Sequence, residues 1–144
     1  MRRAQQSGFT VTFDRDFERI IREAGKRPGE GTWITPDILK TYGELHRLGW
    51  AHSVEVWQGD ELAGGLYGIA LGSLFAGESM FHRITGGSKV AFAATADRLR
   101  ERGFTLFDVQ VLTPHLGLLG CIELPRDEYL ARVGPAIGKP ARFD

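Results

Sequence analysis

The chain is poor in cysteine and has no excess charge of either sign. Its 144 residues contain one cysteine, Cys121, which excludes an internal disulfide and any cysteine-rich zinc site. Basic and acidic side chains number 18 each, so the formal net charge is zero. Proteins that grip long nucleic acids through many phosphates usually carry a basic excess. The charge balance argues against that mode of binding, but not against a pocket for one nucleotide end.

Long apolar runs and metal-binding patterns are also missing. No apolar run approaches the ~18 residues that cross a bilayer, and the first residues do not resemble a secretory signal. We therefore expect no membrane partner and a cytoplasmic location. The four histidines show no metal-ligand spacing, so we expect no metal.

Length and composition predict an ordinary globular protein. Hydrophobic residues make up 42% and charged residues 25% of the chain. At ~150 residues per domain, we expect one domain over 1–144, with flexible tails at 1–8 and 134–144.

Hydrophobic periodicity predicts helices first and then strands. Apolar residues recur at helical spacing over 14–24 and 35–48, and Thr35 and Pro36 are typical of a helix start. The period then changes to two, which predicts strands over 52–57, 62–70 and 73–81. Gly59 and Asp60 predict a hairpin between the first two strands.

The second half of the chain alternates between the two types. We expect a helix over 88–102, a strand over 104–112, a short helix over 113–119, a short strand over 123–124, a closing helix over 125–133 and an extended tail. A meander followed by a helix that crosses to a further strand gives a mixed, mostly antiparallel sheet flanked by helices. This α+β order is the outline of the GNAT-type acyltransferase fold.

Asp108 and Gln110 are the first candidate site residues. Strand periodicity places them on one face, and a carboxylate among Phe, Leu and Val side chains is costly to bury unless it is paired. They are either a polar pair that orients an amine and a carbonyl, or a structural hydrogen-bonded pair near solvent.

Glu78 is a second candidate. The alternation predicts that it shares a face with Leu74, Ala76 and Met80. It is either an acid that meets a ligand's ammonium group at the mouth of an apolar pocket, or the partner of a nearby Arg or Lys.

The glycine loop Arg83–Ser88 and the helix after it give two further expectations. The loop approximates the phosphate-cradling loop of GNAT enzymes, although a plain turn and helix start gives the same pattern. The following helix is rich in alanine, and space beside it lined by Phe92, Leu66 and Met80 would suit a large apolar side chain.

Several blocks occur in the order of one known family. They are TWIT (32–35), LHRLGWAHSVEVW (45–57), GGLYG (64–68), FAGESMF (75–81), SK (88–89), DVQ (108–110) and ELPR (123–126). Together they resemble the leucyl/phenylalanyl-tRNA–protein transferase family over about Phe9 to Val133. Several separate blocks in order are more specific than any one motif.

The resemblance implies an activity and its partners. Family members move Leu or Phe from the 3′ end of aminoacyl-tRNA to proteins that begin with Arg or Lys, which marks them for N-end-rule degradation. The resemblance implies a GNAT-type catalytic domain that uses no cofactor. Full-length members have an additional N-terminal domain, so we interpret the chain as either a natural short form or a truncated chain.

The resemblance also implies residue roles. The catalytic pair corresponds to Asp108 and Gln110. The substrate-binding positions correspond to Trp33 beside the terminal adenosine, Glu78, and the apolar pocket residues Leu66 and Met80. We expect Phe92 and Ser88 to bind substrate as well. Gln110 would orient the amine or the carbonyl, and Asp108 would hold that amide and attract the cationic N-terminus.

Two other functions remain open at this point. One is an acyl-CoA-dependent N-acyltransferase of the same fold, which would use the loop Arg83–Ser88. The other is a non-catalytic relic that binds basic N-termini or RNA ends.

Overall fold

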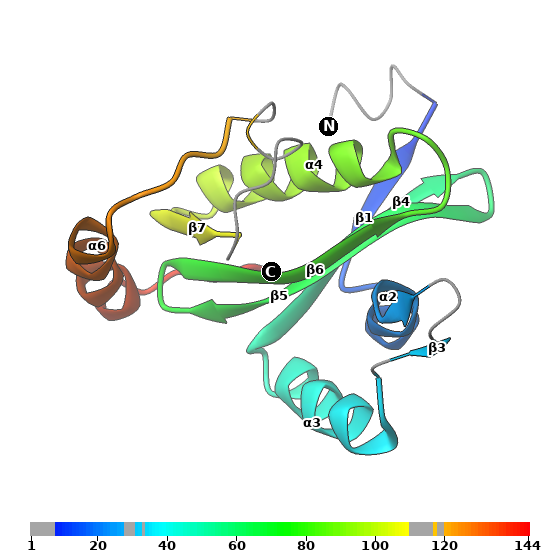
Figure 1. Cartoon of the computed structure of the whole chain (residues 1–144), viewed down its shortest axis with the longest axis horizontal. Coiled ribbons are helices and arrows are strands. Elements are labelled where there is room, and N and C mark those ends of the chain that lie inside the picture. The colour runs from blue at the N-terminus through cyan, green and yellow to red at the C-terminus, as the bar shows by residue number, and fades with distance from the viewer. Residues whose placement is uncertain (1–7, 28–30, 33, 110–116, 118–119) are drawn as a thin grey trace.

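A five-stranded sheet with helices on both faces forms the protein (Figure 1). The computed structural model describes residues 8–27, 31–32, 34–109, 117 and 120–144. The main sheet has the order β1-β4-β5-β6-β7. Its strands are β1 (Thr10–Phe13), β4 (Ala51–Gln58), β5 (Glu61–Leu71), β6 (Leu74–His82) and β7 (Leu106–Asp108). The strands β2 (Lys26–Arg27) and β3 (Gly31–Thr32) form a separate ribbon. The helices are α2 (Phe17–Ala24), α3 (Pro36–Arg47), α4 (Gly87–Glu101) and α6 (Arg126–Gly138).

The predicted fold class is confirmed. All neighbouring strands of the main sheet pair antiparallel except β6 and β7, which run parallel and are connected through α4. The meander β4–β6, the two helices predicted before it and the helix predicted over 88–102 are present within a few residues of their expected bounds. The closing helix predicted over 125–133 is also present and extends to Gly138. Thr35 caps α3 as expected, because its Oγ1 accepts a hydrogen bond from the Ile38 amide at 3.2 Å.

Two sequence predictions differ from the structure, and a third falls almost wholly outside the described residues. Residues 123–124 do not form a strand. The strand expected over 104–112 covers Leu106–Asp108 among the described residues, while 110–112 lie outside them. The short helix expected over 113–119 also lies outside them, apart from residue 117. β1 was not predicted, because a four-residue strand gains its stability from pairing with β4, far along the chain.

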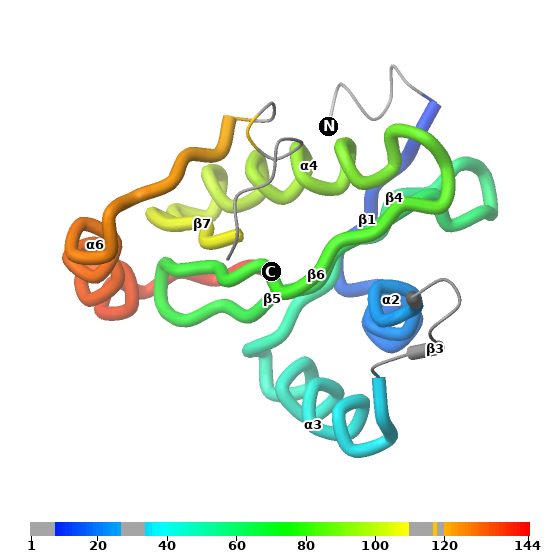
Figure 2. Tube along the Cα trace, in the orientation of Figure 1, coloured from blue at the N-terminus to red at the C-terminus, as the bar shows by residue number. Residues whose placement is uncertain are grey.

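The C-terminal segment 134–144 is not the extended tail that was expected. α6 continues to Gly138, and Phe143 is 1% exposed. The Phe143 ring stacks on Phe75 at 5.3 Å and on His52 at 4.5 Å between centroids. Figure 2 shows the chain returning from α6 along the sheet. Burial of one large aromatic side chain holds this segment in place.

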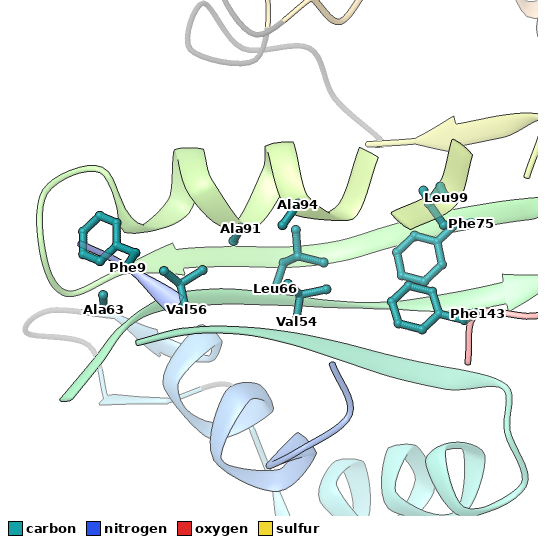
Figure 3. Close-up of a cluster of buried hydrophobic side chains, with 10 residues drawn as sticks. All are labelled: Phe9, Val54, Val56, Ala63, Leu66, Phe75, Ala91, Ala94, Leu99 and Phe143. Carbon is teal, nitrogen blue, oxygen red and sulfur yellow. The ribbon is translucent and has the colours of Figure 1, made fainter. Parts of the chain in front are cut away.

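Two apolar clusters hold the layers together. Figure 3 shows the cluster between α4 and the sheet, where the small side chains of Ala91 and Ala94 point toward Leu66. The other cluster joins α2 and α3 to the opposite face through Ile20, Ile21 and neighbouring residues. The helices therefore cover both faces of β4 and β5 and fix the position of β6.

The start of α4 lies directly on β5. A Cβ added to Gly87 would lie 2.1 Å from the Ala63 carbonyl oxygen, and one added to Gly64 would lie 2.7 Å from the Gly87 carbonyl carbon. Only glycine permits this approach of helix to strand. The contact sets the height of α4 above the sheet and thereby the space left beside β7.

Candidate active site

The sheet opens where β6 and β7 separate. The two strands pair only from Leu74↔Leu106 to Ala76↔Asp108. β6 then continues to His82. In its pairing with β5, Tyr67 lies opposite Ser79 and Gly68 lies opposite Gly77, so Glu78 is an extra residue with no partner on β5. An extra residue of this kind bends a strand and redirects its side chains. The bulge places Glu78 just beyond the last pair, next to the end of β7.

Asp108 is the last residue of β7 and is held by a contact from α6. The Tyr129 hydroxyl donates a hydrogen bond to Asp108 Oδ2 at 2.5 Å. This hydrogen bond, followed by burial and by the charge of Asp108, raises the pKa of the Tyr129 phenol. The hydroxyl therefore stays protonated and continues to donate to the carboxylate at neutral pH.

Glu78 and Asp108 form an acidic pair across the opening. Partial burial raises the pKa of Glu78, and the negative charge of Asp108 raises it further. Glu78 in turn contributes, after burial, to the raised pKa of Tyr42 on α3. The negative charge of Asp108 thus disfavours the ionisation of Glu78, and a cation such as an N-terminal ammonium group would relieve this repulsion.

The apolar candidates lie on the α4 side of the sheet. Leu66 and Met80 are direct partners across β5 and β6, and both pack in the cluster with Phe75. Phe75 and Met80 are five residues apart yet lie on the same face, because the bulge reverses the alternation between them. The prediction that Leu74, Ala76, Glu78 and Met80 all share one face is therefore wrong, because the bulge lies between Ala76 and Met80.

Phe92 lies between this cluster and an open cavity. Its ring stacks on Phe107 with centroids 5.3 Å apart, and Phe107 packs against the cluster that contains Leu66. Of the described residues predicted for the site, Phe92 and Asp108 line the cavity, whereas Leu66, Glu78, Met80 and Ser88 do not. Leu66 is 3% exposed and is part of the packed core.

The cavity has a volume of about 890 Å³ and lies beside β7, against α4 and α6. Its apolar wall includes Phe92, Leu99, Phe104 and Leu106, and its charged residues are Arg100, Asp108, Glu123, Arg126 and Arg132. Sequence reasoning missed the contribution of α6. The signal was present: Arg126, Tyr129 and Arg132 are three residues apart and therefore follow one face of a helix.

Ser88 lies in the first turn of α4 and is half-buried. The loop before it is fixed to β5, because the amides of Arg83 and Ile84 both donate to the Ala63 carbonyl. The Arg83 guanidinium forms an ion pair with Glu23 of α2 at 3.5 Å. The first residue of the loop that approximates a phosphate-cradling loop therefore has a protein partner.

Two predicted site residues, Trp33 and Gln110, lie outside the described residues. Their roles remain predictions from the sequence. Within the described part of the chain, no group of three His, Cys, Asp or Glu side chains is arranged to hold a metal ion. No helix in that part is long and apolar enough to span a bilayer.

The mixed sheet flanked by helices, whose last two strands run parallel and then separate, has the GNAT-type acyltransferase fold. Solved acetyltransferases share it. An aminoglycoside acetyltransferase from an uncultured soil metagenomic sample, in complex with sisomicin, has a TM-score of 0.58 at 13% identity and covers 92% of this chain and 89% of its own. A ribosomal-protein-alanine N-acetyltransferase from Brucella melitensis has a TM-score of 0.55 at 15% identity. The match covers 83% of this chain and 93% of the acetyltransferase chain.

The chain belongs to the leucyl/phenylalanyl-tRNA–protein transferase family, whose model matches residues 1–134. The transferase of Cereibacter sphaeroides is 52% identical over 142 residues, which are 99% of this chain and 65% of that protein. The transferase of Chlorobaculum tepidum is 46% identical over 137 residues, which are 94% of this chain and 71% of that protein. The chain thus spans about two thirds of the length of these relatives.

Proposed function

We propose that the protein transfers Leu or Phe from the 3′ end of aminoacyl-tRNA to the α-amino group of proteins that begin with Arg or Lys. The observation that carries the proposal is the acidic pair Glu78–Asp108 at the separation of β6 and β7, in a chain of this family. Because aminoacyl-tRNA is made in the cytoplasm, the proposal places the protein there.

The proposed reaction is an attack by an amine on an activated ester. The α-amine loses a proton and attacks the ester carbonyl carbon, so that a C–N bond forms. The C–O bond to the ribose breaks, and the displaced oxygen takes up a proton to give free tRNA. Since the ester is already activated, catalysis consists mainly of alignment, which supplies up to ~7–11 kcal/mol in favourable cases.

The acidic pair binds the acceptor in this proposal. An Arg or Lys N-terminus brings two positive charges, one on the α-amine and one on the side chain. Glu78 and Asp108 provide two negative charges at one opening. Gln110 orients the amine or the carbonyl, and Asp108 holds that amide in position.

The apolar side chain of Leu or Phe contacts Phe92 in this proposal. Phe92 lines the cavity beside Asp108 and stacks on Phe107, so it joins the open space to the packed cluster of Leu66 and Met80. Trp33 and Ser88 contact the terminal adenosine and its phosphate. A pocket of this kind selects by size, and one methylene group is worth only ~1–3 kcal/mol.

A transfer assay with isotope-labelled Leu and Phe on tRNA tests the proposal. We expect label to appear in a peptide that begins with Arg and not in its N-acetylated form. Asp108→Ala should abolish transfer while leaving the circular dichroism spectrum unchanged. Binding of the Arg peptide without any transfer, at enzyme in excess over tRNA, would identify a non-catalytic relic instead.

Calorimetry with acetyl-CoA separates the remaining alternative. The Arg83–Glu23 ion pair and the fixed loop before α4 lead us to expect no heat of binding. Micromolar affinity for acetyl-CoA would favour an acyl-CoA-dependent N-acyltransferase and contradict the proposal.

A further inference from the structure

Tyr129 on α6 makes a contact with Asp108 that none of the predicted roles includes. Its hydroxyl donates to Asp108 Oδ2 at 2.5 Å, and the tyrosine ring is half-buried against the cavity wall. A hydrogen bond to an ionised acceptor is about twice as strong as one between neutral groups. The contact therefore restrains the carboxylate at the end of β7.

A group of hydrogen bonds centred on Ser73, in the turn between β5 and β6, forms the frame that holds the two elements of this contact. The Ser73 amide and hydroxyl both donate to the Ala136 carbonyl of α6 at 2.8 Å. Because that bond uses the only hydroxyl hydrogen of Ser73, Thr105 is the donor in the 2.7 Å contact between the Thr105 and Ser73 hydroxyls. Ser73 is fully buried, so these bonds are shielded from water.

Ser73 also holds the start of β7. The amides of Thr105 and Leu106 donate to the Ser73 carbonyl at 2.9 and 3.3 Å. Asp108 follows Thr105 by three residues, and Tyr129 precedes Ala136 by seven, which is two helical turns on one face. Ser73 therefore fixes both elements, and with them the two side chains that meet.

Gly72 lets α6 approach this turn. Its φ is +58°, and a Cβ added there would lie 2.1 Å from the Ile137 carbonyl oxygen. Any other residue would push the end of α6 away from the turn. The approach is thus built into the turn rather than left to surface side chains.

We propose that Tyr129 is a positioning residue for the transfer reaction, which orients the Asp108 carboxylate through its hydroxyl hydrogen bond within the frame set by Ser73. The inference rests on the proposed function of Asp108. Without the hydroxyl, the carboxylate rotates more freely and is subject to repulsion from Glu78. The raised pKa of the Tyr129 phenol accords with this role, because a protonated hydroxyl is needed to donate.

The test is a double-mutant cycle with Tyr129→Phe and Asp108→Asn, measured as single-turnover transfer with enzyme in excess. Tyr129→Phe removes one oxygen and keeps the ring, so we expect an intact fold and a loss of about tenfold in the transfer rate, with little change in the KM for aminoacyl-tRNA. In the Asp108→Asn background the same change should have almost no effect. An equal loss in both backgrounds, or no loss in the single variant, overturns the proposal.

A matched control and a readout without activity complete the test. Leu130→Ala alters the neighbouring residue of α6, whose side chain is 54% exposed, and should leave the transfer rate unchanged. In ¹³C-tyrosine NMR, the Tyr129 resonance should titrate at lower pH in Asp108→Asn than in the unaltered chain. If no variant or unaltered chain transfers an amino acid, the proposed function fails, while the NMR titration still decides whether the contact exists. An unchanged titration overturns the contact itself.

Discussion

Glu78 and Asp108 lie on two strands that pair in parallel and separate at Asp108, and the charge of Asp108 adds to burial in raising the pKa of Glu78. The relationship depends on a bulge that places Glu78 beyond the last ladder pair. Electrostatic strain of this kind is common at functional sites, where a ligand of opposite charge relieves it.

Replacing Glu78 by Gln should stabilise the free protein and impair transfer. The folded protein raises the pKa of Glu78 above its ordinary value of 4.5, so the folded state binds the proton more tightly than the unfolded state. The free energy of unfolding therefore falls as the pH rises from about 4.5 through the pKa of Glu78 in the folded protein. Above that pKa, the destabilisation caused by ionised Glu78 is complete. At pH 7 we expect Glu78→Gln to raise the free energy of unfolding by less than ~1 kcal/mol, since the group is largely exposed and screened.

Urea unfolding at pH 7 and at pH 3.5 measures this effect. The gain should be present at pH 7 and absent at pH 3.5, where both states are protonated. Glu61→Gln, at the exposed start of β5, is the control and should show no gain. A loss of stability at pH 7 would mean that Glu78 has a stabilising cation partner.

Removing the charge of Asp108 should lower the pKa of Glu78 toward its ordinary value. Burial, the larger cause, remains in Asp108→Asn, while the charge of Asp108 is gone. A ¹³C-carboxylate NMR titration of the two proteins gives the answer. An unchanged Glu78 midpoint would show that the two carboxylates do not interact.

Leu66→Ala should destabilise the fold by about 2–5 kcal/mol, as buried Leu-to-Ala changes do. Leu66 is 3% exposed and packs between Val54, Met80 and Ala94 in the cluster under α4. Chemical denaturation measures the loss. A cost below ~1 kcal/mol would mean that Leu66 lines a solvent-filled slot.

Phe143→Ala should destabilise the fold by roughly 3–5 kcal/mol, the usual cost of deleting a buried aromatic ring. Phe143 is 1% exposed and stacks on both Phe75 and His52. Thermal unfolding compares it with Ile137→Ala, where the side chain is 47% exposed and the change should be small. Equal effects in the two variants would contradict the packed C-terminal segment.

Local patterns in the sequence predict most of the elements but not the contacts that depend on pairing. The cap of α3 and the period-two strands β4 to β6 are local signals, and the structure confirms them. The bulge at Glu78 depends on the register with β5, so alternation alone grouped Glu78 with Met80 incorrectly. The resemblance singled out Asp108, whereas Tyr129 emerged only from the docking of α6 on the turn at Ser73.

The end of α6 shows why sequence patterns can place a helix boundary wrongly. Gly134 and Pro135 are typical helix-ending residues, yet α6 includes both. Pro135 removes the hydrogen bond to the carbonyl of Ala131, which is an exposed residue, and the Ser73 contacts hold the following turn. Tertiary contacts thus override a local signal that sequence reasoning reads as a stop.

The central claim is that the opening between β6 and β7 joins an acceptor amine to an aminoacyl ester. Mass spectrometry of a peptide that begins with Arg, incubated with the protein and phenylalanyl-tRNA, tests it most directly. We predict a product heavier by one phenylalanyl residue, with fragment ions that place this residue on the N-terminal amine. An unmodified peptide after incubation with folded protein in molar excess over the tRNA would contradict the claim.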